Sequence, residues 1–277
     1  MLSKIRSHAQ RVRHHLGSEV SFGNQRFKVH GYYANRLNIS ERHERNLTEV
    51  FTRQLQSRPG AFIDVGVNIG QTLCKVLGAD RSRRYIGFEP QIGCCFFVDQ
   101  FLRLNNLENA SILPIALSDA NGTFTLYSGG AYDEMASLVG AQSGTGMSRP
   151  HATRVTARVG DEVLGELGIE DICAIKIDVE GAERQVLAGL EATMRAKRPP
   201  IFFEVLPNFH GNERIRVAED LAVNNRAEAD AIYSFLDRLG YGVAQIDEHA
   251  REKPIARFDL DDREHYVSFN YVARAAR

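Results

Sequence analysis

Residues 61–72 read Ala-Phe-Ile-Asp-Val-Gly-Val-Asn-Ile-Gly-Gln-Thr. A short apolar segment runs into a turn with the pattern Asp64-x-Gly66-x-Asn68-x-Gly70, and the apolar residues that follow recur at helical spacing. Because glycine has no Cβ, it lets the backbone turn sharply and approach a ligand closely. This strand–turn–helix pattern predicts an open α/β sheet with a ligand site at the carboxyl ends of its strands.

The turn differs from two common phosphate-binding loops. A dinucleotide fingerprint would need glycine where Asn68 stands, and the Gly-Lys-Ser/Thr sequence of a P-loop is absent. The carboxylate of Asp64 would repel pyrophosphate but attract a cation or an amine. S-adenosylmethionine (SAM) carries a sulfonium and an amino group and no phosphate, so the turn favours this cofactor. A tight turn without any ligand is the alternative.

Two further acidic segments follow strands of the predicted sheet. Residues 84–90 end in Glu89-Pro90, and an acidic residue about 20 positions past such a turn can accept both ribose hydroxyls. Residues 172–183 form an apolar strand that ends at Asp178, with Glu180 and Glu183 close behind. Glu183 can be explained as a carboxylate near a helix N-terminus, where the helix dipole favours negative charge. The crowding of like charges favours a cationic ligand or a metal nearby.

Composition sets the broad class. The 277 residues are 43% hydrophobic and 25% charged, with a formal net charge of −1, as in ordinary soluble globular proteins. No global field points to nucleic acid. The four cysteines have no zinc-ligand spacing and read as buried free thiols. No apolar run approaches the ~20 residues that span a bilayer. We therefore expect a cytoplasmic protein without a transmembrane segment.

We expect a small cap over residues 1–57 and a ligand-binding domain over 58–277. The cap would hold an Arg-rich amphipathic helix over 1–16, a hairpin over 20–32 and a helix over 39–56 opened by an Asn38–Glu41 capping box. The first helix could pack on its own domain, mediate a homodimer, lie on a membrane or be a transit peptide.

Strands and helices alternate from residue 61 onward, which indicates a mostly parallel sheet. Polar insertions interrupt the alternation near residues 128–151 and 206–226. The strands are predicted near 61–65, 84–88, 111–115, 123–127, 154–158, 172–177, 200–205, 241–246 and 266–273, and the helices near 70–78, 92–105, 161–167, 181–195 and 227–239.

Over roughly residues 50–245 the chain resembles the FkbM family of SAM-dependent methyltransferases. The resemblance implies a class I, Rossmann-like α/β fold with an antiparallel last strand, and usually O-methylation of a sugar or another hydroxylated metabolite. The matching segments are Phe62-Ile-Asp-Val-Gly-Val-Asn-Ile-Gly70, Gly87-Phe-Glu-Pro90, Ala116-Leu-Ser-Asp119 with Gly122, Ile175-Lys-Ile-Asp-Val-Glu-Gly-Ala-Glu183, and Pro200-Ile-Phe-Phe-Glu204.

The resemblance also implies roles for the matching positions. The glycine turn would wrap the methionine half of SAM, Glu89 would hold the ribose, and Asp178 would face the amino group or the transfer site. Thr72, at the helix start, could bind the SAM carboxylate with the free amides there. The cofactor-binding residues implied are Asp64, Gly66, Asn68, Gly70, Thr72, Glu89, Ser118, Asp119 and Asp178.

The acceptor hydroxyl needs a proton acceptor within about 2.6–3.2 Å. The candidates are Asp178, Glu180, Glu204 and His210, and His210 has the best unperturbed pKa for a base near neutrality. The family often has histidine where Leu206 stands here, so His210 would have to substitute. Asp178, Glu180 and Glu204 could instead bind Mg²⁺, which takes oxygen ligands. We favour a site without a metal.

Two other functions stay open. A nucleic-acid methyltransferase would want a basic, aromatic-lined groove, and the charge balance offers none beyond the N-terminus. A non-catalytic SAM-binding protein would have no use for the clustered carboxylates. The acceptor itself, and the pocket that binds it near residues 128–151 and 206–226, cannot be read from the sequence.

Overall fold

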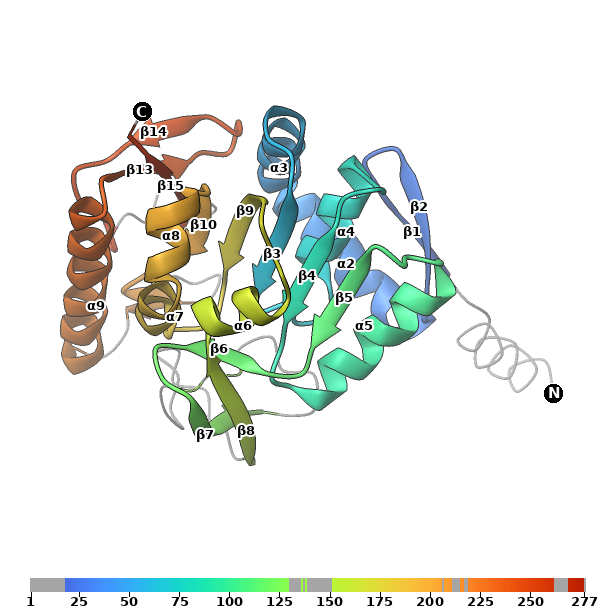
Figure 1. Ribbon diagram of the computed structural model, residues 1–277, viewed down its shortest axis with the longest axis horizontal. Helices are drawn as coiled ribbons and strands as arrows, with labels where there is room; N and C mark the ends of the chain where they lie inside the picture. Colours follow the sequence, from blue (N-terminus) through green and yellow to red (C-terminus); the bar gives the residue numbers. More distant parts are fainter. Residues whose placement is uncertain are drawn as a thin grey trace.

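The computed structural model describes residues 18–129, 136, 138, 151–205, 207–210, 215–216, 219–261 and 269–276. An eight-stranded sheet in the order β14-β13-β15-β10-β9-β3-β4-β5 forms its centre (Figure 1). The predicted helix over residues 1–16 lies outside the described residues. The strands are β14 Glu252–Pro254, β13 Tyr241–Ile246, β15 Asn270–Ala275, β10 Ile201–Glu204, β9 Ile172–Ile177, β3 Ala61–Val65, β4 Tyr85–Phe88 and β5 Ala110–Leu113.

The middle of the sheet is parallel and its last strand is antiparallel. Strands β10, β9, β3, β4 and β5 pair in parallel, whereas β15 pairs antiparallel with both β10 and β13. This is a Rossmann-like sheet in which the last strand of the chain, β15, lies between β10 and β13. The predicted α/β fold with an antiparallel last strand is confirmed.

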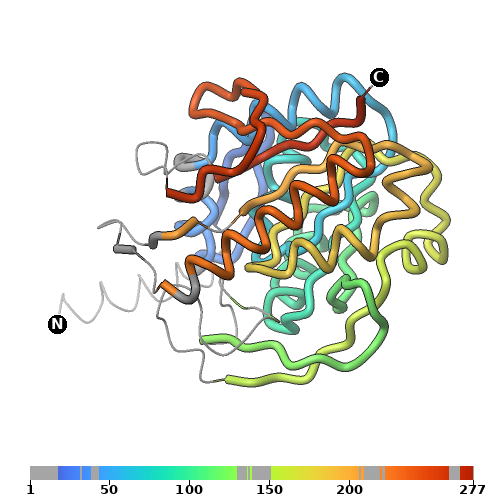
Figure 2. Tube along the Cα trace, turned by 90° about the vertical axis from the view of Figure 1, so that its left-hand side faces the viewer, coloured from blue at the N-terminus to red at the C-terminus, as the bar shows by residue number. Residues whose placement is uncertain are grey.

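Each face of the sheet has its own hydrophobic core. One core joins Phe62 and Phe202 of the sheet with the N-terminal elements and helices α2 to α5, and the other joins Ile63 and Phe203 with helices α6 to α9. Figure 2 shows the same layers from the side. The helices are α2 Gly31–His43, α3 Arg45–Ser57, α4 Gln71–Ala79, α5 Ile92–Leu104, α6 Gly160–Glu166, α7 Glu183–Gly189, α8 Glu191–Lys197 and α9 Glu219–Arg238.

The N-terminal hairpin has the predicted form. Strands β1 (Ser18–Phe22) and β2 (Gln25–Val29) pair antiparallel around the Gly23-Asn24 turn. The hairpin packs closely on α4. A Cβ added to Gly78 of α4 would lie only 2.6 Å from the Phe22 carbonyl oxygen, so the close approach needs glycine there. The predicted division of the chain at residue 57 stays a prediction.

Three helix predictions were wrong in their bounds. The helix expected over 39–56 is two helices that meet at Glu44, and Asn38 and Glu41 lie inside α2 rather than at a helix start. Glu44 makes no capping bond, because its side chain bonds to Lys75 instead. The helix expected over 181–195 is divided at Leu190 into α7 and α8, and the last helix starts at 219 rather than 227.

A second, three-stranded sheet has the order β6-β8-β7, with β6 Ala116–Ser118, β7 Gly122–Ser128 and β8 His151–Val159. Its longest ladder runs from the Gly122–Ala157 pair to the Ser128–His151 pair. The two ends of the segment between β7 and β8 are therefore held together by strand pairing. A short ladder also joins β11 (Phe209–His210) and β12 (Ile215–Arg216).

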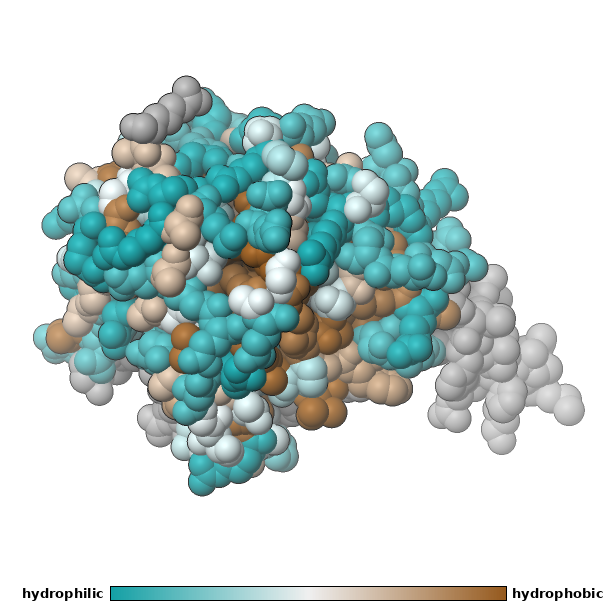
Figure 3. Space-filling view, in the orientation of Figure 1, coloured by the Kyte–Doolittle hydropathy of each residue, from teal (hydrophilic) through white to brown (hydrophobic). Residues whose placement is uncertain are grey.

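The surface in Figure 3 is mostly hydrophilic, with hydrophobic side chains gathered across its centre. Helix α5 contributes exposed Ile92 and Phe96. All four cysteines are free and buried. Within the described ranges, no helix is both long and apolar enough to cross a lipid bilayer.

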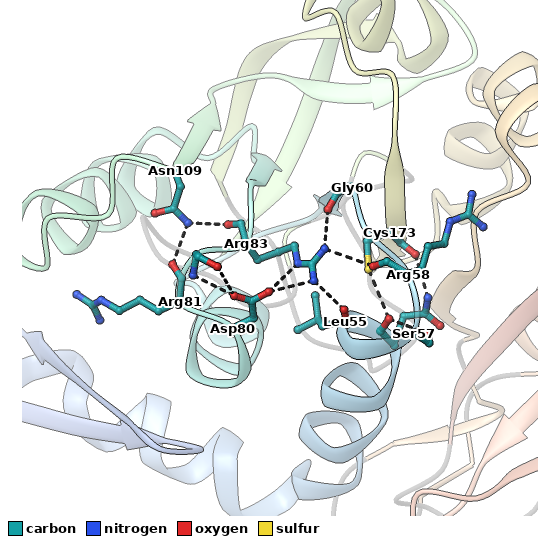
Figure 4. Close-up of polar contacts among 11 residues, drawn as sticks. Leu55, Ser57, Arg58, Gly60, Asp80, Arg81, Arg83, Asn109 and Cys173 are labelled. Atoms are coloured by element: carbon teal, nitrogen blue, oxygen red, sulfur yellow. Dashed lines mark hydrogen bonds and ion pairs between the residues drawn. The ribbon is translucent and has the colours of Figure 1, made fainter.

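An arginine network holds the amino ends of the strands (Figure 4). The Arg83 guanidinium donates to the carbonyl oxygens of Leu55, Arg58 and Gly60 at 2.7, 3.3 and 3.1 Å and pairs with Asp80 at 3.0 Å. Burial alone would raise the pKa of Asp80, but hydrogen bonds from Ser82 and the charge of Arg83 outweigh it and lower that pKa. The polar groups of this network are thus satisfied by one another at this edge of the sheet.

Candidate active site

The carboxyl ends of the parallel strands bring the predicted acidic residues to one edge of the sheet. Asp64 lies in β3, Glu89 and Asp178 directly follow β4 and β9, and Glu204 ends β10. A cavity opens at this edge. Its described lining consists of Val65, Gly66, Asn68, Phe88, Glu89, Pro90, Gln91, Ala116, Leu117, Leu126, Ala136, Leu138, Asp178, Val179, Glu180 and Ala182.

The glycine turn forms one wall of this cavity. Gly66 has φ +90°, and a Cβ there would lie 1.8 Å from the Asp178 carbonyl oxygen, so the turn touches the end of β9 directly. Asn68 also has positive φ, and its Oδ1 accepts a bond from the Ile69 amide at 2.7 Å. Gly70, with φ +92°, is the residue before α4. The sequence thus uses left-handed positions where two strand ends and a helix start converge.

Glu89 is buried and held by the backbone. Its Oε2 accepts from the Asn68 amide and its Oε1 from the Gln91 amide, both at 2.8 Å. Burial raises the pKa of Glu89 to about 7, although these amides act in the opposite direction. Each carboxylate oxygen can accept a second bond, so the group is positioned to accept from a ligand at the end of β4.

Asp64 is fully buried beneath the turn. The Tyr85 hydroxyl donates to its Oδ2, while its Oδ1 has no hydrogen-bond partner among the described residues. Burial raises the pKa of Asp64 to about 7, and the nearby Lys176 ammonium partly offsets this. A buried acceptor without a partner is costly. This arrangement fits a site that a donor or a cation completes.

Asp178 lies at the rim of the cavity, with its side chain 37% exposed. Its Oδ2 accepts a 2.8 Å bond from the Lys176 ammonium, which is itself buried in β9. The sequence analysis did not assign Lys176. A lysine inside the apolar run Ile172–Ile177 was the available signal, because charged residues are almost never fully buried unless paired.

Glu204 and Glu180 complete the acidic edge. Burial raises the pKa of Glu204 well above its ordinary value, and the carboxylates of Asp178, Glu180 and Glu44 add to the shift. Glu183 is held by the backbone, because its carboxylate accepts bonds from the Val179 and Gly181 amides.

The crowding of carboxylates after β9 is therefore relieved partly by backbone amides and by Lys176. In the part of the chain that the structure describes, no group of three or more histidine, cysteine, aspartate or glutamate side chains is arranged to hold a metal ion. Nothing thus supports the suggested Mg²⁺ site of Asp178, Glu180 and Glu204.

The remaining predicted residues are less closely tied to the cavity. Thr72 lies in the first turn of α4. Ala116 and Leu117 line the cavity, but Ser118 and Asp119 are not among its lining residues, and the Ser118 hydroxyl donates to Asp119 at 3.2 Å. His210 lies in β11, and its side chain is outside the description. The proposed roles of all these residues stay predictions.

Three residues join the site that sequence reasoning missed. Tyr85 donates to Asp64 from the neighbouring strand. Glu44, at the break between α2 and α3, is one of the charges that act on Glu204, and it pairs at 2.7 Å with Lys75 of α4. The Glu44–Lys75 pair therefore connects the N-terminal helices to the carboxyl edge of the sheet.

The strand order, the glycine turn and the acidic strand ends together define a class I methyltransferase. The family model described as "Methyltransferase FkbM domain" matches residues 64–243. The chain belongs to the FkbM methyltransferase family.

The individual proteins that this chain resembles share 28% sequence identity with it or less. The chain is 28% identical over 249 residues to the AMB antimetabolite synthetase AmbE of Pseudomonas aeruginosa, a match that covers 75% of this chain and 11% of AmbE. A methyltransferase FkbM from Methylobacillus flagellatus aligns at 15% identity and TM-score 0.44, over 78% of this chain and 43% of the other. A precorrin-6y C5,15-methyltransferase from Geobacter metallireducens aligns at 10% identity and TM-score 0.42, over 82% and 87%.

Proposed function

We propose that the chain is a SAM-dependent O-methyltransferase that acts on a hydroxyl of a small molecule, a sugar or a glycosylated metabolite. Methyl transfer follows from the family; the cofactor, the oxygen acceptor and its class are the proposal. One observation carries it. Among the described residues that line the cavity, Glu89, Asp178 and Glu180 are acidic and none is basic, which suits a cationic, phosphate-free ligand.

The site residues fit SAM in chemistry. Asp64, with its unpartnered Oδ1, and Asp178, at the rim, would attract the amino group and the sulfonium. Glu89 would accept from the ribose hydroxyls, since its backbone bonds leave acceptor capacity on both oxygens. SAM would supply an electrophilic methyl group there.

The protein's contribution to transfer is alignment and proton removal. Alignment alone can contribute ~7–11 kcal/mol to the rate. Glu204 ends β10 at the same edge of the sheet and is a candidate for the base, and the charges of Asp178 and Glu180 act on it. His210 stays a candidate by prediction.

Calorimetry with SAM and its product S-adenosylhomocysteine (SAH) tests the cofactor. We expect the wild type to bind both, and Glu89→Gln to weaken SAH binding by about 10- to 100-fold, because a buried polar contact contributes about 1–3 kcal/mol. Glu191→Gln is the matched control, since that glutamate pairs with Arg195 and Arg238 on the surface. Absence of SAH uptake by the wild type would reject the proposal.

The acceptor class needs a separate assay. We expect methyl transfer from labelled SAM to hydroxyl groups in a panel of sugars and glycosides, and none to DNA or RNA oligonucleotides. Transfer to an oligonucleotide would favour the nucleic-acid alternative, and SAM binding without turnover on any acceptor would favour a non-catalytic binding protein. Activity that persists in excess EDTA would remove the Mg²⁺ alternative.

Location and assembly also belong to the proposal. The four buried free thiols support a reducing, cytoplasmic compartment. Light scattering on the purified chain would show whether it forms the homodimer that the sequence left open.

A further inference from the structure

Lys176 occupies an unusual place in the sheet. It lies in the parallel strand β9, level with Asp64 of β3 on one side and with Phe202 of β10 on the other. Side chains level with each other on neighbouring strands point to the same face, and so do those two positions further on. Asp64, Lys176 and Glu204 therefore share the face that α3 and α4 cover.

The Lys176 side chain is only 4% exposed, and its ammonium lies near several carboxylates. It donates to Asp178 Oδ2 at 2.8 Å, and the charges of Asp64 and Glu204 also act on it. Burial alone would lower the pKa of Lys176, but these carboxylates raise it above its ordinary value. The lysine therefore stays positively charged beneath the cavity.

We propose that Lys176 is a positioning residue of the cofactor site: its ammonium holds the Asp178 carboxylate at the rim of the cavity and lets Asp64 and Asp178 carry negative charge side by side. The inference rests on the proposed function in one respect, since Asp178 is the carboxylate of this pair that lines the cavity and would meet the SAM amino group. Lys176 itself would touch neither substrate nor cofactor.

The charge of Lys176 strongly affects its neighbours, because acidic groups from several strands surround it. Without its charge, Asp64 would lose the interaction that offsets its burial, while the repulsion from Asp178 would remain, so Asp64 would hold a proton near neutral pH. The titratable and charged groups around the cluster are Asp64 of β3, Tyr85 of β4, Glu89 after β4, Asp178 and Glu180 after β9, Glu204 of β10, and Glu44 before α3 with its partner Lys75 of α4.

The test compares two buried lysines. In Lys176→Met, the pH midpoint of SAH binding should rise by about one unit or more, so that binding below both midpoints is about tenfold weaker for each unit. Lys176→Arg should keep the wild-type midpoint. Lys75→Met is the comparison variant: Lys75 is equally buried, but its pair is Glu44 on the helical side, which acts on Glu204, so the midpoint should move less than in Lys176→Met.

A ligand-free measurement separates the two proposals. Carbon-13 NMR titration of the Asp64 carboxyl, assigned with Asp64→Asn, should show a higher midpoint in Lys176→Met than in the wild type. No SAH uptake by the wild type rejects the cofactor, whereas an unchanged Asp64 midpoint in Lys176→Met rejects the role of Lys176.

A second variant covers failure to fold. If Lys176→Met is unfolded by circular dichroism, the double variant Lys176→Met/Asp64→Asn removes one charge of each sign and should fold. The pH midpoint of its SAH binding should lie above that of Asp64→Asn alone. Equal midpoints in these two variants would overturn the inference.

Discussion

The two edges of the central sheet handle charge in opposite ways. At the amino edge, Arg83 binds three carbonyl oxygens and Asp80, and the pKa of Asp80 is lowered. At the carboxyl edge, the pKa values of Asp64 and Glu89 are raised to about 7 by burial. Charge is compensated at one edge and left under-compensated at the other.

The difference separates stability from function in one sheet. A satisfied network such as that of Arg83 stabilises the fold without needing a ligand. The unpartnered oxygen of Asp64 destabilises the ligand-free protein. A ligand that donates a hydrogen bond or carries a positive charge would satisfy this oxygen. Perturbed carboxyls gathered at a cavity are typical of functional sites.

The largest effect is expected at the glycine turn. Gly66→Ala should lower the free energy of unfolding by about 4 kcal/mol or more, because its Cβ would lie 1.8 Å from the Asp178 carbonyl oxygen. Urea unfolding would measure the loss.

Gly70→Ala is the matched variant for this prediction. Gly70 has nearly the same positive φ, but the atom nearest to its added Cβ is a leucine methyl carbon at 3.5 Å. The loss should be only about 1–2 kcal/mol, the cost of the left-handed backbone. Equal losses in the two variants would show that backbone strain, and not contact with the end of β9, determines the turn.

Arg83→Met at the amino edge should come next. We expect a loss of about 2–4 kcal/mol in urea unfolding, since several carbonyl oxygens and Asp80 lose their partner. The SAH affinity of the folded variant should match the wild type in calorimetry. A changed affinity together with unchanged stability would erase the contrast between the two edges.

The last comparison is the response of the ligand-free protein to pH. Asp64, Glu89 and Glu183 have folded pKa values of about 7, above their unfolded values, so the folded state binds more protons between about pH 4.5 and 7. Stability should therefore fall as pH rises through that window.

The amino edge responds in the opposite sense. Asp80, whose pKa is lowered, contributes stability that is present above its unfolded pKa and lost as pH falls below it. Urea midpoints between about pH 4 and 8 should pass through a maximum near pH 5, and Glu89→Gln should flatten the decline above it. Stability that rises steadily from pH 5 to 7 would contradict the raised values at the carboxyl edge.

Strand ends could be predicted from the sequence, and contacts across the sheet could not. Asp64, Glu89 and Asp178 were found because each ends an apolar run, and parallel strands bring such ends together. Tyr85 and Lys176 were missed, because their roles depend on strand register and on which face the side chains share. The break at Glu44 was also missed, since the bond to Lys75 that accompanies it comes from another helix.

The ladder between β7 and β8 has a consequence for how this family could diversify. Ser128 and His151 are paired, so residues inserted or deleted between them leave the anchoring strands in register. Doubling the length of a loop whose two ends are fixed adds only about 0.6 kcal/mol of closure entropy. Evolution, or an engineer exchanging this stretch between relatives, could therefore vary its length while the strands stay paired, and would change the cavity only through the lining positions that the stretch carries, such as Ala136 and Leu138.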